Sequence, residues 1–248
     1  LDLWPNSPGV SFFSKVSFHN HAALNPFYNL IFSATQYEDF DGRYNFFDEQ
    51  ERSDLFAELY PPTSPSDTTT IVISKQRPNI VVVLLESMGA YLIESLGGMP
   101  DVAPNLNKLC KEGVNFSRCY CSSFRTDRGI VSALSGYPGQ PTSSIIRYPN
   151  KSQNLPGLPK VLKSLGYATQ ALYAGDATFF NMSGYFLSAG HDKMITQLDF
   201  KQSSAKTKWG IHDHEAFNWL FNDLLEKAKS GIPSYTTFLT ISSHEPFD

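Results

Sequence analysis

The chain has 248 residues, of which 41% are hydrophobic and 18% charged, a composition typical of a folded globular protein and not of a disordered one. Twenty Lys and Arg against 24 Asp and Glu leave a net charge of −4 without any basic stripe, which argues against nucleic-acid binding. The longest aliphatic run, 80–85, is far shorter than the roughly 18 residues that span a bilayer, so no transmembrane helix is predicted within these residues.

Residues 1–76 are expected to form a helical arm and linker with no chemistry of their own. Helical patterns occupy 22–35 and 47–58, and the turn-prone stretch 60–67 follows them. The chain opens without Met and stops directly after an apolar run. We therefore expect it to be a piece of a longer protein whose C-terminal part is missing.

Residues 77–248 alternate predicted strands with predicted helices. The β-branched run 79–85 is typical of a strand buried on both faces, and we expect it to be central in its sheet. Further strands are expected at 114–119, 167–173 and 235–241, and helices at 104–112, 127–135, 158–165 and 212–229. The alternation predicts an α/β fold with a mainly parallel central sheet sandwiched by helices.

Polar residues follow three of the predicted strands, where ligands bind in open α/β sheets. They are Glu86, Asp176 and His244. Singly, each has a simpler explanation, as a charge favouring a helix N-terminus, a turn residue or a solvated loop histidine. Their occurrence at three successive strand ends favours a site.

The segment 121–129 places three hydroxyls and two arginines at the start of a predicted helix, and these are Ser122, Ser123, Thr126, Arg125 and Arg128. A helix N-terminus with Arg nearby is suited to an anion, and a bound metal can activate a threonine hydroxyl as a nucleophile. The alternative is that Thr126 or Ser123 is an ordinary N-cap.

Two further features are interpreted as structural. The three cysteines are odd in number and lack zinc-site spacing, which favours small buried apolar residues. His212 and His214 flank Asp213, but residues two apart on a helix point in different directions. We therefore interpret Asp213 as a cap or positioning residue and not as part of a metal site.

Several segments in order along 77–248 resemble the alkaline phosphatase/sulfatase superfamily, and within it the branch of lipoteichoic acid synthases and phosphoglycerol transferases. They are RPNIVVVLLESMG (77–89), APNLN (103–107), FRTD (124–127), LSGYP (134–138), GDATFFNM (175–182), WGIHD (209–213) and SHEPF (243–247). The resemblance implies a metal-dependent transferase or hydrolase of phosphate esters, acting on cell-envelope lipids or glycans. It also implies membrane helices upstream, which would anchor the full-length protein in the cytoplasmic membrane with this domain outside.

The resemblance assigns roles to single residues. Glu86 matches a carboxylate that binds a divalent metal, commonly Mn²⁺, with Mg²⁺ or Zn²⁺ as alternatives. Thr126 matches the nucleophile, which also binds the metal and becomes phosphorylated. The family's remaining ligands lie beyond residue 248, so we expect residues 1–248 alone to be inactive.

The substrate-binding residues that we expect are His244, Arg125, Arg128, Asp176 and Asn181. The chain also departs from lipoteichoic acid synthase, whose His, Trp and Arg hold the glycerol phosphate. Ala174, Phe180 and Met182 stand at those positions here. The transferred group is therefore left open, with Arg125 and Arg128 as compensating charge.

Two alternatives to a phosphate-ester enzyme remain. A sulfuric ester hydrolase needs a Cys/Ser-x-Pro-x-Arg motif, and 121–125 has no proline in place. A catalytically inactive binding or sensing domain is compatible with the departures at Ala174 and Met182.

Overall fold

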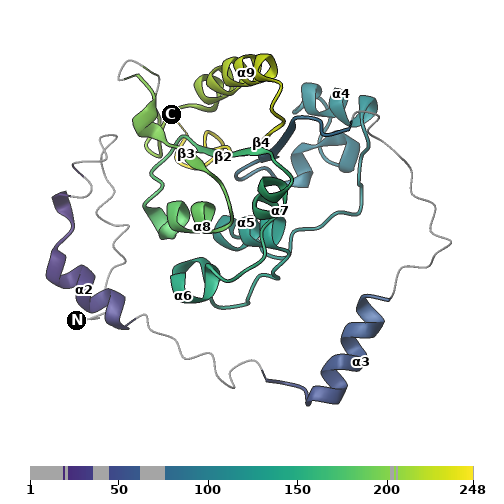
Figure 1. Ribbon diagram of the computed structural model, residues 1–248, viewed down its shortest axis with the longest axis vertical. Helices are drawn as coiled ribbons and strands as arrows, with labels where there is room; N and C mark the ends of the chain where they lie inside the picture. The colour runs from purple at the N-terminus through teal and green to yellow at the C-terminus, as the bar shows by residue number, and fades with distance from the viewer. Residues whose placement is uncertain are drawn as a thin grey trace. The chain divides into compact units, whose positions relative to one another are not determined.

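The computed structural model describes residues 19, 22–35, 45–61, 76–201, 204 and 206–247. The chain divides into two units, Leu1–Gln76 and Arg77–Asp248. In the first unit, α2 spans Pro26–Thr35 and α3 spans Glu49–Leu59, close to the predicted helices (Figure 1). Most of the predicted linker at 60–67 lies outside the described residues. No helix in the described ranges is both long and apolar enough to cross a membrane.

In the described part of the second unit, four parallel strands form one sheet in the order β1-β4-β2-β3. The last residues of three of the strands are level, since Leu84 and Tyr173 both pair with Leu239. The segments that follow these strands therefore emerge at one edge of the sheet. The strands are β1 (Ile80–Leu84), β2 (Ala168–Tyr173), β3 (Lys193–Ile195) and β4 (Ser234–Leu239).

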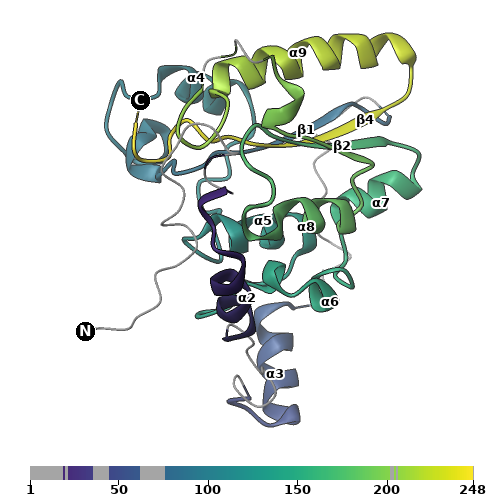
Figure 2. The ribbon, with the colours of Figure 1, turned by 90° about the vertical axis from the view of Figure 1, so that its left-hand side faces the viewer.

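Helices cover both faces of this sheet, with α9 on one side and α5, α6, α7 and α8 on the other (Figure 2). The α/β class with a parallel sheet between helices is confirmed. The α-helices are α4 (Pro104–Glu112), α5 (Thr126–Ser135), α6 (Pro149–Ser152), α7 (Leu158–Ser164), α8 (Met182–Ser188) and α9 (Asp213–Ser230). Short 3₁₀ helices are η2 (Ala90–Leu92), η3 (Glu94–Leu96), η4 (Ile145–Arg147), η5 (Phe179–Asn181) and η6 (Gln197–Asp199).

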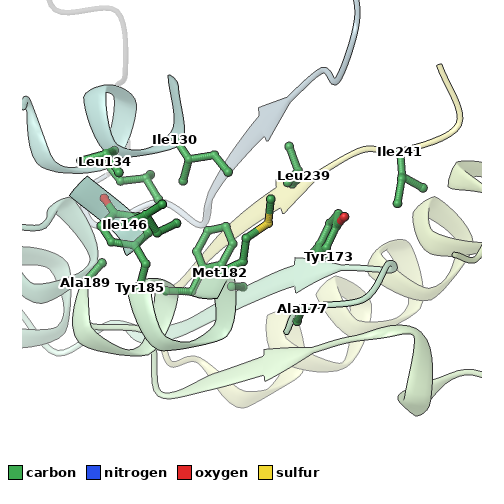
Figure 3. Close-up of a cluster of buried hydrophobic side chains, with 13 residues drawn as sticks. Ile130, Leu134, Ile146, Tyr173, Ala177, Met182, Tyr185, Ala189, Leu239 and Ile241 are labelled. Atoms are coloured by element: carbon green, nitrogen blue, oxygen red, sulfur yellow. The ribbon is translucent and has the colours of Figure 1, made fainter. Parts of the chain in front are cut away.

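The main core lies between the sheet and helices α5 and α8 (Figure 3). Ile130 and Leu134 of α5 and Tyr185 of α8 are almost completely buried there, against Tyr173 and Leu239 of the sheet. A second core forms under α9, where Ala216 and Leu220 pack with Leu172 and Phe238. Because both cores hold the sheet, its strand ends are fixed relative to the start of α5.

The expectation that β1 is central is wrong for the described strands, because β4 and β2 occupy the middle positions. All six residues of β4 are buried, whereas Val81 and Val83 of β1 remain 37% and 38% exposed. A run of β-branched residues favours a strand, but it does not specify how many neighbours that strand has.

Two local predictions also fail. Residues 114–119 form an irregular loop with a turn at 117–118 and not a strand. Val114 and Phe116 there are 57% and 75% exposed, so the apolar side chains of this segment are not packed. Cys119 and Cys121 are exposed and Cys110 is half-buried, contrary to the prediction that the cysteines are buried apolar residues. These residues lack the packing partners that the apolar pattern alone implied.

Candidate active site

The site begins with a contact between the end of β1 and the start of α5. Glu86 follows β1, and Thr126 is the first residue of α5. The Thr126 hydroxyl Oγ1 donates a hydrogen bond of 2.6 Å to Oε2 of Glu86, and both residues are partly buried. The expected approach of a carboxylate and a hydroxyl from residues 40 apart in sequence is therefore present in the structure.

The backbone of Glu86 is held by the neighbouring strand. Its N–H donates to Oγ1 of Thr240 at 2.8 Å, while the N–H of Thr240 donates to the carbonyl of Leu84 at 3.1 Å. Thr240 is 4% exposed, so water does not compete with these bonds. The end of β4 thus fixes the position from which the Glu86 carboxylate projects.

Tyr173, at the end of β2, completes the buried base of the site. Burial raises the pKa of its phenol, and the charges of Glu86 and Asp176 raise the pKa further. The ring is 8% exposed, so Tyr173 keeps its proton at neutral pH. Asp176 accepts hydrogen bonds from the N–H and the hydroxyl of Thr178, at 3.0 and 2.7 Å, so its Oδ1 shapes the turn after β2.

The two serines that rival Thr126 are engaged elsewhere. Oγ of Ser122 lies 2.5 Å from Oγ of Ser132 and accepts from the N–H of Gly139 at 3.1 Å. Oγ of Ser123 accepts from the N–H of Arg125 at 3.3 Å. Of the three hydroxyls, the one that contacts Glu86 is that of Thr126.

The two arginines named from the sequence differ in placement. Nε of Arg125 lies 3.2 Å from Oδ1 of Asp127, whose side chain is 4% exposed, so Arg125 is fixed beside Thr126. Arg128 instead donates from Nη1 to the carbonyl of Pro141 at 3.0 Å. The structure therefore directs Arg128 toward the loop after α5 and not toward Glu86.

Asp213 organises the segment that follows β4. Its carboxylate accepts hydrogen bonds from the N–H groups of Ile241 and Ser242, at 2.8 and 2.9 Å, as expected of a positioning residue. The prediction that His212 and His214 point apart is wrong, because their rings stack with centroids 5.5 Å apart. His212 is the N-cap of α9 with non-helical dihedrals, so helical spacing does not apply to it.

His244 lies at the same edge of the sheet, four residues after Thr240. Its Nδ1 donates to the carbonyl of Glu245 at 2.7 Å, and Nε1 of Trp209 donates to the same oxygen at 2.8 Å. The ring centroids of Trp209 and His244 are 4.6 Å apart. With its proton on Nδ1, a neutral His244 presents Nε2 as an acceptor.

Two residues of the segment after β2 are packed into the cores. Ala174 is 1% exposed in the core under α9, and Met182 is 5% exposed in the core with α5 and α8. Phe180 between them is half-buried. Asn181 donates from Nδ2 to the carbonyl of Ile146 at 2.9 Å, so its amide fastens this turn to η4.

The paired oxygens of Glu86 and Thr126 fit part of a site for a hard divalent cation such as Mn²⁺ or Mg²⁺. Within the described residues, no group of three or more His, Cys, Asp or Glu side chains gathers to hold a metal. Of the residues named above, Glu86 and Thr126 are the two whose side-chain oxygens lie together.

Comparison with known proteins places this geometry in a family. A family model described as Sulfatase matches residues 78–248. The chain belongs to the sulfatase family. A protein of the alkaline phosphatase superfamily from Vibrio parahaemolyticus shares the fold, with a TM-score of 0.72 and 28% identity over 83% of this chain and 52% of that one. The lipoteichoic acid synthase LtaP from Listeria monocytogenes has the same fold, with a TM-score of 0.62 and 22% identity over 70% of this chain and 42% of that one.

Among curated proteins, the chain is similar to a lipoteichoic acid synthase and a phosphoglycerol transferase. Lipoteichoic acid synthase 2 of Bacillus subtilis is 31% identical over 179 residues, covering 68% of this chain and 26% of that protein. Phosphoglycerol transferase I of Xanthomonas campestris is 26% identical over 207 residues, covering 76% of this chain and 29% of that protein. The chain thus spans less than a third of the length of these relatives.

Proposed function

We propose that the full-length protein is a metal-dependent enzyme that transfers or hydrolyses phosphate esters of cell-envelope lipids or glycans, with Thr126 as its nucleophile. The observation that carries the proposal is the 2.6 Å contact between Thr126 Oγ1 and Glu86 Oε2 at the N-terminus of α5. The names of the curated relatives, a lipoteichoic acid synthase and a phosphoglycerol transferase, support the substrate class.

In the reaction, the Thr126 hydroxyl loses its proton as Oγ1 forms a bond to phosphorus. The bond between phosphorus and the leaving oxygen breaks, and that oxygen takes up a proton to leave as an alcohol. The product is a phosphothreonine, and an acceptor hydroxyl or water then takes the phosphoryl group and regenerates Thr126. Glu86 and Thr126 would hold a divalent cation, and its positive charge would lower the pKa of the hydroxyl and stabilise charge on the phosphoryl oxygens. Glu86 orients the hydroxyl, and the first-turn amides of α5 face the developing negative charge.

His244 and Arg125 are proposed to contact the substrate. His244 offers Nε2 toward a substrate or acceptor hydroxyl, because its Nδ1 proton is committed to Glu245. Arg125 offers charge beside Thr126, with its Nε held by Asp127. Upstream membrane helices and an extracytoplasmic location remain part of the proposal.

The test uses the full-length protein loaded with Mn²⁺ and an envelope phospholipid substrate. Thr126→Ala is expected to abolish turnover, while Ser123→Ala, which removes a neighbouring hydroxyl, is expected to retain most of it. Turnover that persists in Thr126→Ala would contradict the proposal. A sulfatase would instead release sulfate from a sulfate ester under the same conditions.

A further inference from the structure

Positive charge exceeds negative charge around the start of α5. Arg125, Arg128 and Arg147 all interact electrostatically in this region, and the buried Asp127 is the acidic partner that favours the charge of Arg147. Asp127 is already paired with Arg125 at 3.2 Å. Glu86, which contacts Thr126, is the second carboxylate at the start of α5. Two carboxylates therefore lie near three guanidinium groups, and a guanidinium stays protonated at any physiological pH.

Within the part of the chain that the structure describes, Arg128 and Arg147 both lack a carboxylate contact, but Arg128 donates to the carbonyl of Pro141. Arg147 ends η4, and its Cζ lies 4.2 Å from the ring centroid of Phe180, while Cζ of Arg125 lies 5.5 Å from the same centroid. Among the described residues, the side chain of Arg147 forms no ion pair or hydrogen bond. A ring covers a guanidinium through its face and leaves the N–H edge available to bind an anion.

The turn that presents Phe180 is strained. Phe180 and Asn181 have φ values of 49° and 60°, a region that is unfavourable for a bulky side chain. The Asn181 amide ties this turn to the carbonyl of Ile146, the residue before Arg147. Such strain concentrates at functional sites, where neighbouring contacts maintain it. Phe180 and Arg147 are thus positioned together by a connection that costs conformational energy.

We infer that Arg147, held on the ring of Phe180, binds the anionic oxygens of the substrate's phosphate group next to Thr126, with Arg125 as the second cation. The inference rests on the proposed function for the class of substrate. A planar guanidinium matches two phosphate oxygens at once, which a lysine ammonium cannot do.

The experiment measures binding of inorganic phosphate to the full-length, Mn²⁺-loaded protein by calorimetry. Arg147→Ala is expected to weaken binding about 10- to 100-fold, as loss of a charged hydrogen-bonding group does. Arg147→Lys is expected to fall between Arg147→Ala and the wild type. Lys229→Ala is the matched control, because this exposed lysine pairs with Glu226 at the far end of α9 and its loss should change nothing.

Kinetics with a soluble phosphodiester separate this inference from the proposed function. A raised KM in Arg147→Ala, partly restored in Arg147→Lys, supports the inference. Turnover that needs Thr126 but has the same KM and phosphate affinity in Arg147→Ala and Lys229→Ala overturns the inference and leaves the function standing. Phosphate affinity that depends on Arg147 in a protein without turnover would refute the function and leave the anion site standing. A wild type that binds no phosphate would overturn the inference.

Discussion

Replacing Thr240 by valine tests how the fold positions Glu86. Valine has nearly the same shape as threonine but lacks the Oγ1 that accepts the N–H of Glu86 at 2.8 Å. Because Thr240 is only 4% exposed, water cannot replace the lost acceptor. A buried donor left without a partner costs about 1–3 kcal/mol of unfolding free energy. Displacement of a catalytic group by about 1 Å can reduce turnover about 100-fold.

The assay compares Thr240→Val with Thr240→Ser in the full-length protein, by urea unfolding and by turnover with Mn²⁺. Serine keeps the hydroxyl and loses one methyl group, which costs about 1 kcal/mol or less. We expect Thr240→Val to lower kcat about 10- to 100-fold and Thr240→Ser to stay close to the wild type. Equal kcat in the two variants would show that the Thr240 hydroxyl does not position Glu86.

Three further predictions concern the metal, the pH dependence of stability and the packing of the site. Glu86→Gln removes the negative charge of a proposed metal ligand. Mn²⁺ affinity measured by calorimetry should therefore fall by more than the roughly 10- to 100-fold loss seen when a residue that only supports a ligand is replaced. Unchanged affinity would exclude Glu86 as a ligand. Burial lowers the pKa of His191 from 6.5 to about 4. As the pH falls, the His191 ring is therefore protonated in the unfolded chain before it is protonated in the folded chain. The contribution of neutral His191 to the unfolding free energy, complete above about pH 6.5, is lost as the pH falls toward 4. The loss amounts to about 2 kcal/mol of unfolding free energy between pH 7 and pH 5. His191→Gln should remove this loss from the profile of unfolding free energy against pH. A profile that is the same in His191→Gln and the wild type would refute the prediction. Gly210 has a φ of 154°, and a Cβ at this position would collide with the carbonyl oxygen of Ala174. Gly210→Ala should therefore lower the unfolding free energy by about 2 kcal/mol or more. Gly129→Ala is the control and should not lower it, because a Cβ at Gly129 would meet open space.

The regular elements of residues 77–248 were largely predictable because their signals are local. The run 79–85 became β1, and the expected helix 104–112 has the bounds of α4, with Pro at its start and Gly113 after its end. β3 was missed, since three residues at the edge of a sheet carry too little pattern to predict a strand. The neighbours of β1 depend on contacts distant in sequence and could not be predicted from its composition.

The candidate site was predictable where it follows strand ends and family motifs. Glu86 and Thr126 were named from their segments, and the structure brings them together. The supporting residues Thr240, Tyr173 and Trp209 were missed as parts of the site, although a polar residue directly after a buried strand is a usable signal for Thr240. These three act through tertiary contacts that no periodicity records.

Arg147 could not be predicted from the sequence for a different reason. It belongs to a 3₁₀ helix with no amphipathic pattern, and its partner ring lies in a turn with two residues at positive φ. Neither feature follows from local propensity, because the strain is maintained by a hydrogen bond between Asn181 and Ile146. The placement of Arg147 on the ring of Phe180 was therefore visible only in the folded chain.

The central claim is that Thr126 is the nucleophile that Glu86 orients. The most direct measurement is mass spectrometry of the full-length, Mn²⁺-loaded protein trapped by acid during turnover of an envelope phospholipid. We expect a covalent phosphoryl group on Thr126, absent in Thr126→Ala and strongly reduced in Glu86→Gln. A phosphoryl group on Ser122 or Ser123, or turnover without any modified residue, would contradict it.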